Sequence, residues 1–215
     1  MTGAFAALAG KLAAGSPTVR WRPQRRPPGP ARAAVLLLLA ETDRPDLLFT
    51  ERSARLRKHA GQISFPGGGL EPGDADATAA ALRETREEIG LCNSEIRVLG
   101  RLPATGLAVS RFDVAPVVGA WSGRDELLNG SADEVAAIHR WTLADLADPA
   151  SRCTARHPSG RLGPGWRFGE VFLWGFTAYL TDALLDLGGW ARPWPHERVL
   201  DVPARFLDDR GPVRG

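Results

Sequence analysis

Runs of apolar residues separated by polar turns predict several β-strands along the chain. The run AAVLLLLA at residues 33–40 has no polar position and predicts a buried strand. The run DLLFTER at residues 46–52 follows the polar turn ETDRP and predicts a second strand. Further strands are expected at residues 96–102, 112–121 and 137–143, because each segment contains β-branched or aromatic residues between polar, glycine or proline borders.

Helical spacing of apolar residues appears in two other segments. A helix is expected from about residue 76 to residue 89, with Asp74 and Asp76 as candidate caps at its start and Gly90 as a stop. The segment 169–189 begins like a strand and continues like a helix. The apolar residues that fall on one face of this second helix are Phe176, Leu180, Leu184 and Leu187.

The flanks differ from the middle of the chain. The first fifteen residues lack a basic start and carry Lys11 inside their apolar stretch, so a short helix fits them better than an export signal. Residues 17–32 combine proline with five arginines, and a solvated connector is favoured there over an interaction tail. We therefore divide the chain into an N-terminal helix and arm (1–32), one domain (33–189) and a C-terminal tail (190–215).

Strands and helices are mixed in this order without a regular strand–helix–strand alternation, which predicts the α+β class, with a sheet layered between helices. At 215 residues the chain is long enough for one sizeable core. With 44% hydrophobic and 24% charged residues, the composition is that of an ordinary soluble globular protein.

Charge and cysteine content restrict the function further. The net charge of +2 gives no strong field for a polyanion, which disfavours nucleic acid as a partner. Cys92 and Cys153 form no metal-ligand spacing and no disulfide framework, so a reducing cytoplasm is expected. The longest apolar run, residues 33–40, is too short to cross a bilayer, and no membrane association is expected.

The helix expected at residues 76–89 carries an unusual group of acids. Glu84, Glu87 and Glu88 fall within an arc of about 100° on one face, where like charges repel. One interpretation is a solvated acidic face. The other is a cation site, since clustered carboxylates without nearby Cys or His favour Mg²⁺ or Mn²⁺ over zinc. Arg83 can reach Glu87 one turn later and hold it in orientation.

The loop before this helix favours the cation site. The stretch FPGGG at residues 65–69 places three glycines where a backbone can approach a ligand closely. It is not a P-loop, because no Gly-Lys-Ser/Thr follows, and Pro72 breaks a G-x-G-x-x-G pattern. Glycine loop and acidic helix together suggest backbone oxygens and glutamates around one metal.

From residue 68 to residue 91 the chain resembles the Nudix box, a loop–helix signature of hydrolases that act on nucleoside diphosphates linked to another moiety. The box ends in REUxEExGU, where U is a bulky aliphatic residue, and this chain has RETREEIGL. Thr85 departs from the pattern at a packing position. The loop is also one residue longer, with Asp74 nearest the usual first glutamate, so the role of that glutamate is not transferred.

A second stretch narrows the resemblance. LFTERSARLRKHAGQISFPGG, residues 48–68, is similar to the signature of the coenzyme A pyrophosphatase branch of Nudix enzymes. Segments 113–119, 133–143 and 172–178 agree with it, so the resemblance covers about residues 33–187. It implies a Nudix-like α/β/α sandwich and metal-dependent hydrolysis of the coenzyme A pyrophosphate bond, giving 4'-phosphopantetheine and adenosine 3',5'-bisphosphate.

The resemblance also implies roles for individual residues. Glu84 and Glu88 are expected to be Mg²⁺ or Mn²⁺ ligands, and Glu87 a third ligand or the base, oriented by Arg83. Glu134 is a further acid–base candidate, as is Asp113, although either carboxylate fits a structural role. Residues expected to bind substrate are Arg52, Arg57, Gln62, Gly67 and Gly68; Arg55 fits the surface equally well, and His59 fits packing better than phosphate contact.

Three hypotheses stay open at this point. The first is the coenzyme A pyrophosphatase, acting on a small molecule and compatible with a homodimer. The second is a Nudix hydrolase of another substrate, such as NADH, ADP-ribose or a dinucleotide polyphosphate. The third is a non-catalytic binding module whose basic arm contacts nucleic acid or a partner. No Ser-His-Asp or Cys-His pair is evident, so a covalent nucleophile is not expected.

Overall fold

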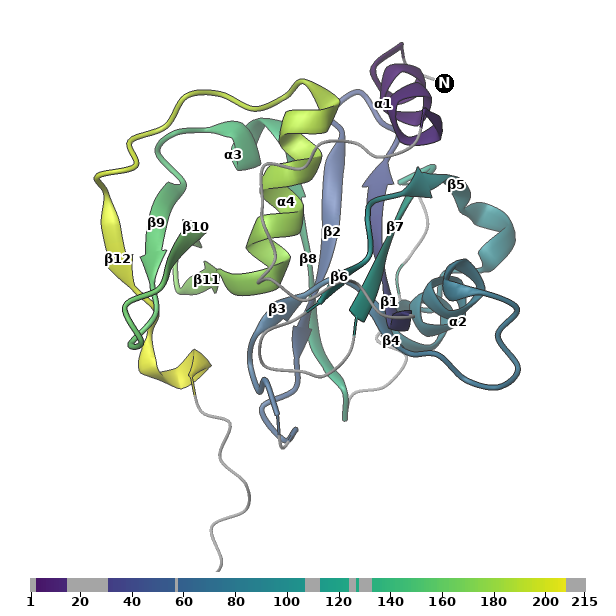
Figure 1. The fold of residues 1–215 in the computed structure, drawn as a ribbon, viewed down its shortest axis with the longest axis horizontal. Coiled ribbons are helices and arrows are strands. Elements are labelled where there is room, and N and C mark those ends of the chain that lie inside the picture. Colours follow the sequence, from purple (N-terminus) through teal and green to yellow (C-terminus); the bar gives the residue numbers. More distant parts are fainter. Residues whose placement is uncertain are drawn as a thin grey trace, which may run out of the picture.

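A computed structural model describes residues 3–14, 31–56, 58–106, 113–123, 127 and 133–207. Most of the Pro/Arg arm and the last eight residues lie outside this range. Within it the strands form two sheets (Figure 1). The first sheet contains β1 (Ala31–Ala40), β2 (Asp46–Arg52), β3 (Ile63–Ser64), β4 (Gly67–Gly69), β5 (Arg97–Arg101), β6 (Thr105–Gly106), β7 (Asp113–Trp121) and β8 (Val135–Thr142).

The helices of the described residues lie on both faces of the first sheet. They are α1 (Gly3–Ala13), α2 (Ala77–Ile89), α3 (Leu143–Ala147) and α4 (Gly175–Gly188), with short 3₁₀ turns η1 (Asn93–Glu95) and η2 (Ala204–Phe206). Helix α2 covers one face, whereas α1 and α4 pack together on the other (Figure 1). The sheet is mixed, since β1 pairs in parallel with β7 and antiparallel with β2. This confirms the α+β class with a sheet between helices.

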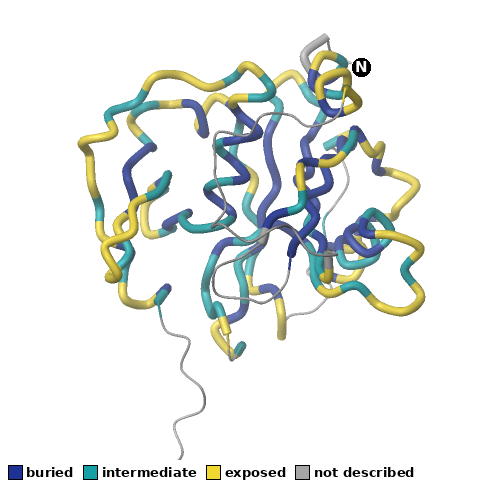
Figure 2. Tube along the Cα trace, in the orientation of Figure 1, coloured by how far each residue is buried: buried dark blue, intermediate teal, exposed yellow. Residues whose placement is uncertain are grey.

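The burial of β1 explains why its residues 33–40 include no polar position. Leu36 and Leu38 face α2, whereas Leu37 and Leu39 face the core built on α1 and α4, and all four are fully buried. A strand covered on both faces has no solvent side, so the usual alternation of apolar and polar residues disappears. The buried centre and exposed periphery are visible in Figure 2.

The predicted helix boundaries agree closely with the structure. Helix α2 begins after Asp76, whose Oδ1 accepts from the Ala79 N–H at 2.9 Å, and ends at Gly90 in the left-handed conformation. A helix is also present within the first fifteen residues, and its Phe5 and Leu8 are fully buried in the core shared with α4. No helix of the described residues is long and apolar enough to span a membrane.

The second sheet was predicted only in part, through the strand-like start of segment 169–189. It contains β9 (Arg152–Arg156), β10 (Leu162–Phe168), β11 (Val171–Leu173) and β12 (Val199–Asp201). Glycines, a proline and arginines interrupt the apolar pattern of β9 and β10, which weakens the strand signal. Strand β12 comes from the C-terminal segment and pairs in parallel with β9.

Candidate active site

Helix α2 packs through one side and presents carboxylates from another. Ala81, Thr85 and Ile89 are fully buried against the first sheet. The Thr85 hydroxyl donates to the Ala81 carbonyl at 2.7 Å, which satisfies its polar atom inside the core. A threonine is therefore accommodated where the sequence pattern asks for a larger aliphatic residue.

The three glutamates of α2 lie in different surroundings. Glu88 is only 6% exposed, and the side chain of Glu84 is 16% exposed. Glu87 is half exposed. A solvated acidic face therefore describes Glu87 but not Glu84 or Glu88, and the helix turns two carboxylates into the protein.

Burial makes the ionised form of Glu88 costly. It raises the pKa of Glu88 to about 8, and the nearby carboxylates of Glu84 and Glu134 add to the increase. The Gly67 N–H, which donates to Glu88 Oε2 at 3.3 Å, and the positive charge of Arg52 act in the opposite direction. At neutral pH this group holds a proton unless a further positive charge is near.

Glu84 reaches the same glycine loop. A Cβ placed on Gly68 would lie 2.3 Å from Glu84 Oε1, so only glycine leaves room for this carboxylate in its observed position. Burial also raises the pKa of Glu84, although the neighbouring Arg83 partly opposes the increase. The glycines of β4 thus bring backbone atoms against both buried carboxylates.

Arg83 joins the loop to the helix. Its Nε and one Nη each bond a different Asp74 oxygen at 3.1 Å, and the same Nη donates to the Gly69 carbonyl at 2.9 Å. The other Nη bonds Glu84 Oε1 and Glu87 Oε2, both at 3.1 Å, so the expected contact with Glu87 is present. This hydrogen bonding from Arg83 lowers the pKa of Asp74.

The interaction of Asp74 with Arg83 was not predicted from the sequence. Asp74 was noticed as a possible helix cap and as the residue nearest the usual first glutamate of the Nudix box, whose role was not transferred. The structure shows that Asp76 caps α2 instead. Asp74 also accepts the Glu71 N–H at 2.8 Å, which closes the loop turn. The signal in the sequence was an aspartate nine residues before an arginine, too far apart for helical spacing to link them.

Two further candidates, Arg52 and Glu134, come from the end of β2 and from the turn before β8. The Ser53 N–H donates to the Glu134 carbonyl at 2.8 Å, which holds Glu134 beside the end of β2. Its charge acts on both Glu84 and Glu88. Arg52, the last residue of β2, has a buried Nε without a hydrogen-bond partner. A buried donor without a partner is costly, and a ligand oxygen would satisfy it.

Comparison with known proteins assigns the chain to a family. A NUDIX domain model matches residues 29–158. The chain is 41% identical over 166 residues to the uncharacterized Nudix hydrolase NudL of Citrobacter koseri, covering 73% of this chain and 83% of that protein. The chain belongs to the Nudix family. NudL of Escherichia coli K12 is 40% identical over the same shares of the two chains.

Among solved structures, a Nudix hydrolase from Alicyclobacillus acidocaldarius matches with a TM-score of 0.46 and 17% identity, over 75% of this chain and 93% of that chain. The family assignment rests on the domain match and on the NudL proteins. It makes the acidic α2 and the glycine loop the Nudix loop–helix of this chain.

The donor set of the Nudix helix suits a hard divalent cation. Glu84 and Glu88 offer carboxylate oxygens, and a cation between them would offset both their burial and their repulsion. In the described part of the chain no three His, Cys, Asp or Glu side chains form a closed metal site. Two carboxylates are nevertheless sufficient for Mg²⁺, which usually keeps waters or substrate phosphates as its other ligands.

Two of the other predicted residues bond to groups other than the Nudix carboxylates. The Arg55 side chain is 79% exposed and pairs with Asp133 at 2.9 Å, which fits the surface role. Asp113 is buried at the start of β7. Gln62 donates from Nε2 to the Phe206 carbonyl at 2.7 Å. Arg57 lies outside the described residues, so its assignment stays a prediction.

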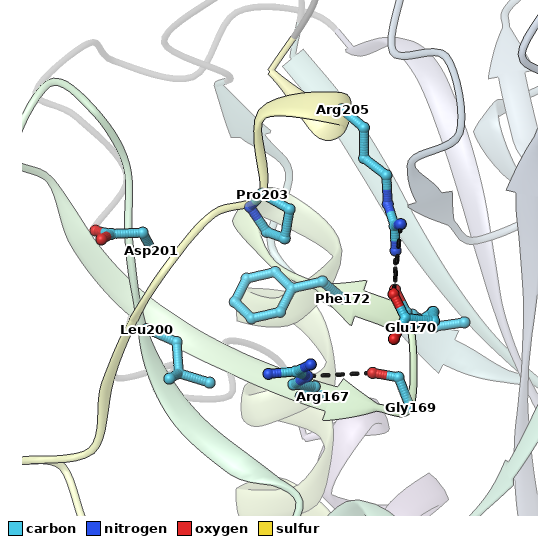
Figure 3. Close-up of a pocket in the computed structure, with 9 residues that line it drawn as sticks. Arg167, Gly169, Glu170, Phe172, Leu200, Asp201, Pro203 and Arg205 are labelled. Carbon is cyan, nitrogen blue, oxygen red and sulfur yellow. Dashed lines mark hydrogen bonds and ion pairs between the residues drawn. The ribbon is translucent and has the colours of Figure 1, made fainter.

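A pocket of about 200 Å³ opens on the second sheet instead (Figure 3). Its lining residues are Arg167, Gly169, Glu170, Val171, Phe172, Leu200, Asp201, Pro203 and Arg205. Both arginines are engaged locally, Arg167 with the Gly169 carbonyl and Arg205 with Glu170. The pocket belongs to β10–β12 and η2, on the side of the molecule away from α2 in Figure 1.

Proposed function

We propose that this Nudix protein hydrolyses the pyrophosphate bond of coenzyme A or a derivative, giving 4'-phosphopantetheine, or its acyl form, and adenosine 3',5'-bisphosphate. At the family level it is a Nudix hydrolase of a nucleoside diphosphate derivative. The observation that carries the proposal is the arrangement of two carboxylates, buried Glu88 and largely buried Glu84, against the glycine loop, with Arg52 acting on Glu88.

The choice of coenzyme A depends on where residues 48–68 lie. This stretch resembles the signature of the coenzyme A branch, and it contains most of β2, all of β3 and the start of β4. One part of it, Gly67, donates to Glu88, and another, Arg52, acts on the charge of Glu88. The segment that carries substrate specificity in the resemblance is therefore in contact with the candidate catalytic helix.

Each residue of the site has a task in this reaction. Mg²⁺ or Mn²⁺ bound by Glu84 and Glu88 would neutralise phosphate oxygens and lower the pKa of the attacking water. Arg83 fixes Glu84 and Glu87 through its two hydrogen bonds, which keeps both carboxylates in place. Arg52 offers its unpaired Nε to a phosphate oxygen. Glu87 and Glu134 are the candidates to accept the proton of the water.

A substrate panel tests the proposal. Coenzyme A, NADH, ADP-ribose and a diadenosine polyphosphate are compared by kcat/KM, each with and without Mg²⁺ or Mn²⁺. The proposal expects metal-dependent release of 4'-phosphopantetheine and the highest kcat/KM for coenzyme A or a derivative. A higher value for another member of the panel would move the assignment to that substrate, and no hydrolysis of any member would support a binding module.

A further inference from the structure

The described C-terminal segment adds the edge strand β12 to the second sheet, and η2, which follows it, lies beside the candidate substrate loop. Phe206 in η2 is 5% exposed and packs in a small apolar cluster with Cys153, Phe172 and Val202. Strand β12 anchors the segment by pairing with β9. The position of η2 is thus fixed by packing and by strand pairing, independently of the Nudix helix.

From this fixed position η2 holds Gln62. Gln62 Nε2 donates to the Phe206 carbonyl at 2.7 Å, a contact between residues 144 positions apart. The ring of Phe206 also lies close to the loop backbone, with Cε1 4.0 Å from where a Cβ on Gly61 would be. The C-terminal segment therefore touches the loop at two successive residues.

A short chain of contacts connects Gln62 to the carboxylates. The Arg52 N–H donates to the Gln62 carbonyl at 3.0 Å, and the Gly61 N–H donates to the Arg52 carbonyl at 2.9 Å. The next residue, Ile63, pairs with Glu51 across β2 and β3. Since the charge of Arg52 acts on Glu88, Gln62 lies one backbone hydrogen bond from a residue of the candidate site.

We propose that η2 is a positioning element for substrate binding, which acts by fixing the carboxamide of Gln62. A carbonyl oxygen accepts only from the amide nitrogen, so the Phe206 carbonyl selects one of the two orientations of this carboxamide. The Oε1 atom and one N–H of the Gln62 carboxamide stay available for a ligand. Because this side chain is already ordered, substrate binding loses less conformational entropy. This inference rests on the proposed function only in treating Gln62 as a substrate-binding residue.

A double-mutant cycle on the full chain tests the proposal, with Phe206→Ala, Gln62→Ala and the double variant. Loss of the Phe206 side chain frees η2, so Phe206→Ala should raise KM roughly fivefold and change kcat by less than about twofold. In the Gln62→Ala background the same substitution should change KM by less than about twofold, because the group through which it acts is gone. Leu8→Ala, which truncates a fully buried apolar side chain in the core shared by α1 and α4, is the matched control and should leave KM unchanged.

Several results would overturn the proposal. They are an equal KM effect of Phe206→Ala in both backgrounds, an effect of Leu8→Ala as large as that of Phe206→Ala, and a fall in kcat without a change in KM. If Phe206→Ala does not fold, Phe206→Leu replaces it, since leucine retains an apolar side chain in the cluster.

Failure of the positioning role can be separated from failure of the coenzyme A assignment. The cycle is run with whichever member of the substrate panel is hydrolysed best, so another preferred substrate overturns the assignment but still tests Gln62 and Phe206. Calorimetric titration with ADP gives a second readout without turnover. Its Kd should follow the same non-additive pattern, and an additive pattern would refute the positioning role.

Discussion

Two buried ionisable side chains in this protein, Arg152 and Glu88, have contrasting surroundings. Arg152 in the second sheet is 1% exposed and pairs with Asp182 of α4. Its guanidinium carbon lies over the rings of Trp166 and Trp194, 4.3 and 4.4 Å from their centroids. Glu88 in the Nudix helix is almost as buried, but it has one N–H donor at 3.3 Å and faces further carboxylates. The positive charge of Arg152 is thus paired with a carboxylate, whereas Glu88 has no ion-pair partner among the described residues.

The difference distinguishes a structural charge from a functional one. Burial lowers the pKa of Arg152, but the attraction of Asp182 opposes this effect, and the aromatic faces provide favourable cation–π contacts. For Glu88 burial and neighbouring acids act in the same direction, toward the neutral form. A site in which burial and neighbouring acids disfavour an ionised carboxylate is stabilised by a ligand of positive charge.

The largest expected effect comes from replacing Glu88, the buried carboxylate without an ion-pair partner in the described part of the chain. Glu88→Gln retains the size of the side chain and loses a metal ligand, so kcat/KM should fall at least about 100-fold, beyond the loss typical of a residue that only supports a ligand. Steady-state kinetics at saturating Mg²⁺ measure it. Glu197→Gln, on the exposed C-terminal segment, removes the same charge elsewhere and should be neutral. Full activity of Glu88→Gln would contradict the assignment of Glu88.

A smaller loss is expected when the residue that orients the carboxylates is changed. Arg83→Lys retains the charge but cannot bond Asp74, Gly69, Glu84 and Glu87 at once, since lysine has a single nitrogen. We expect kcat/KM to fall about 10-fold, with a higher Mg²⁺ concentration at half-maximal rate. Arg86→Lys, exposed on the same helix, is the control. Equal behaviour of the two variants would make Arg83 a surface ion pair only.

For the pair of Arg152 and Asp182, the expected effect is on stability rather than on activity. Asp182→Asn leaves Arg152 buried without its counter-charge, and the free energy of unfolding should fall by about 2 kcal/mol, less than for a fully buried pair because Asp182 is one-third exposed. Denaturant unfolding measures this change, with exposed Asp43→Asn as the control. Activity per folded molecule should be unchanged, and a loss of kcat/KM without a loss of stability would connect this pair to catalysis.

The sequence predicted the Nudix region well for a physical reason. The boundaries of α2 are set by local chemistry, a capping aspartate and a terminating glycine, which can be read within a few residues. The apolar strand β1 is also a local signal. The burial of Glu84 and Glu88 could not be predicted in this way, because it depends on β4, a three-glycine strand whose place in the sheet is set by pairing with β1.

Most of the second sheet was not predicted, because its stability is not local. Its strands contain Gly163, Pro164 and Gly165, which have low strand propensity, and it is held by β12 from a distant part of the chain. The contact of Gln62 with Phe206 is equally non-local. Gln62 could be predicted as a candidate for substrate binding, but its partner depends on how the C-terminal segment folds over the sheet.

The same contrast between Glu88 and Arg152 predicts a pH dependence of stability in the absence of metal. A carboxyl group with a raised pKa binds its proton more tightly in the folded state than in the unfolded chain. Its stabilisation is therefore fully present below its ordinary pKa of 4.5 and is lost as the pH rises through about 8.

Metal-free protein should accordingly lose about 2 kcal/mol of unfolding free energy between mildly acidic and alkaline pH relative to Glu88→Gln, which has no such group to ionise. Saturating Mg²⁺ should reduce this difference, because a cation beside Glu88 favours the ionised form and removes the cause of the loss. Denaturant unfolding of both proteins with EDTA and with Mg²⁺ measures it across this pH range. Parallel pH profiles for the two metal-free proteins would mean that Glu88 ionises freely in the fold, and its contrast with Arg152 would then disappear.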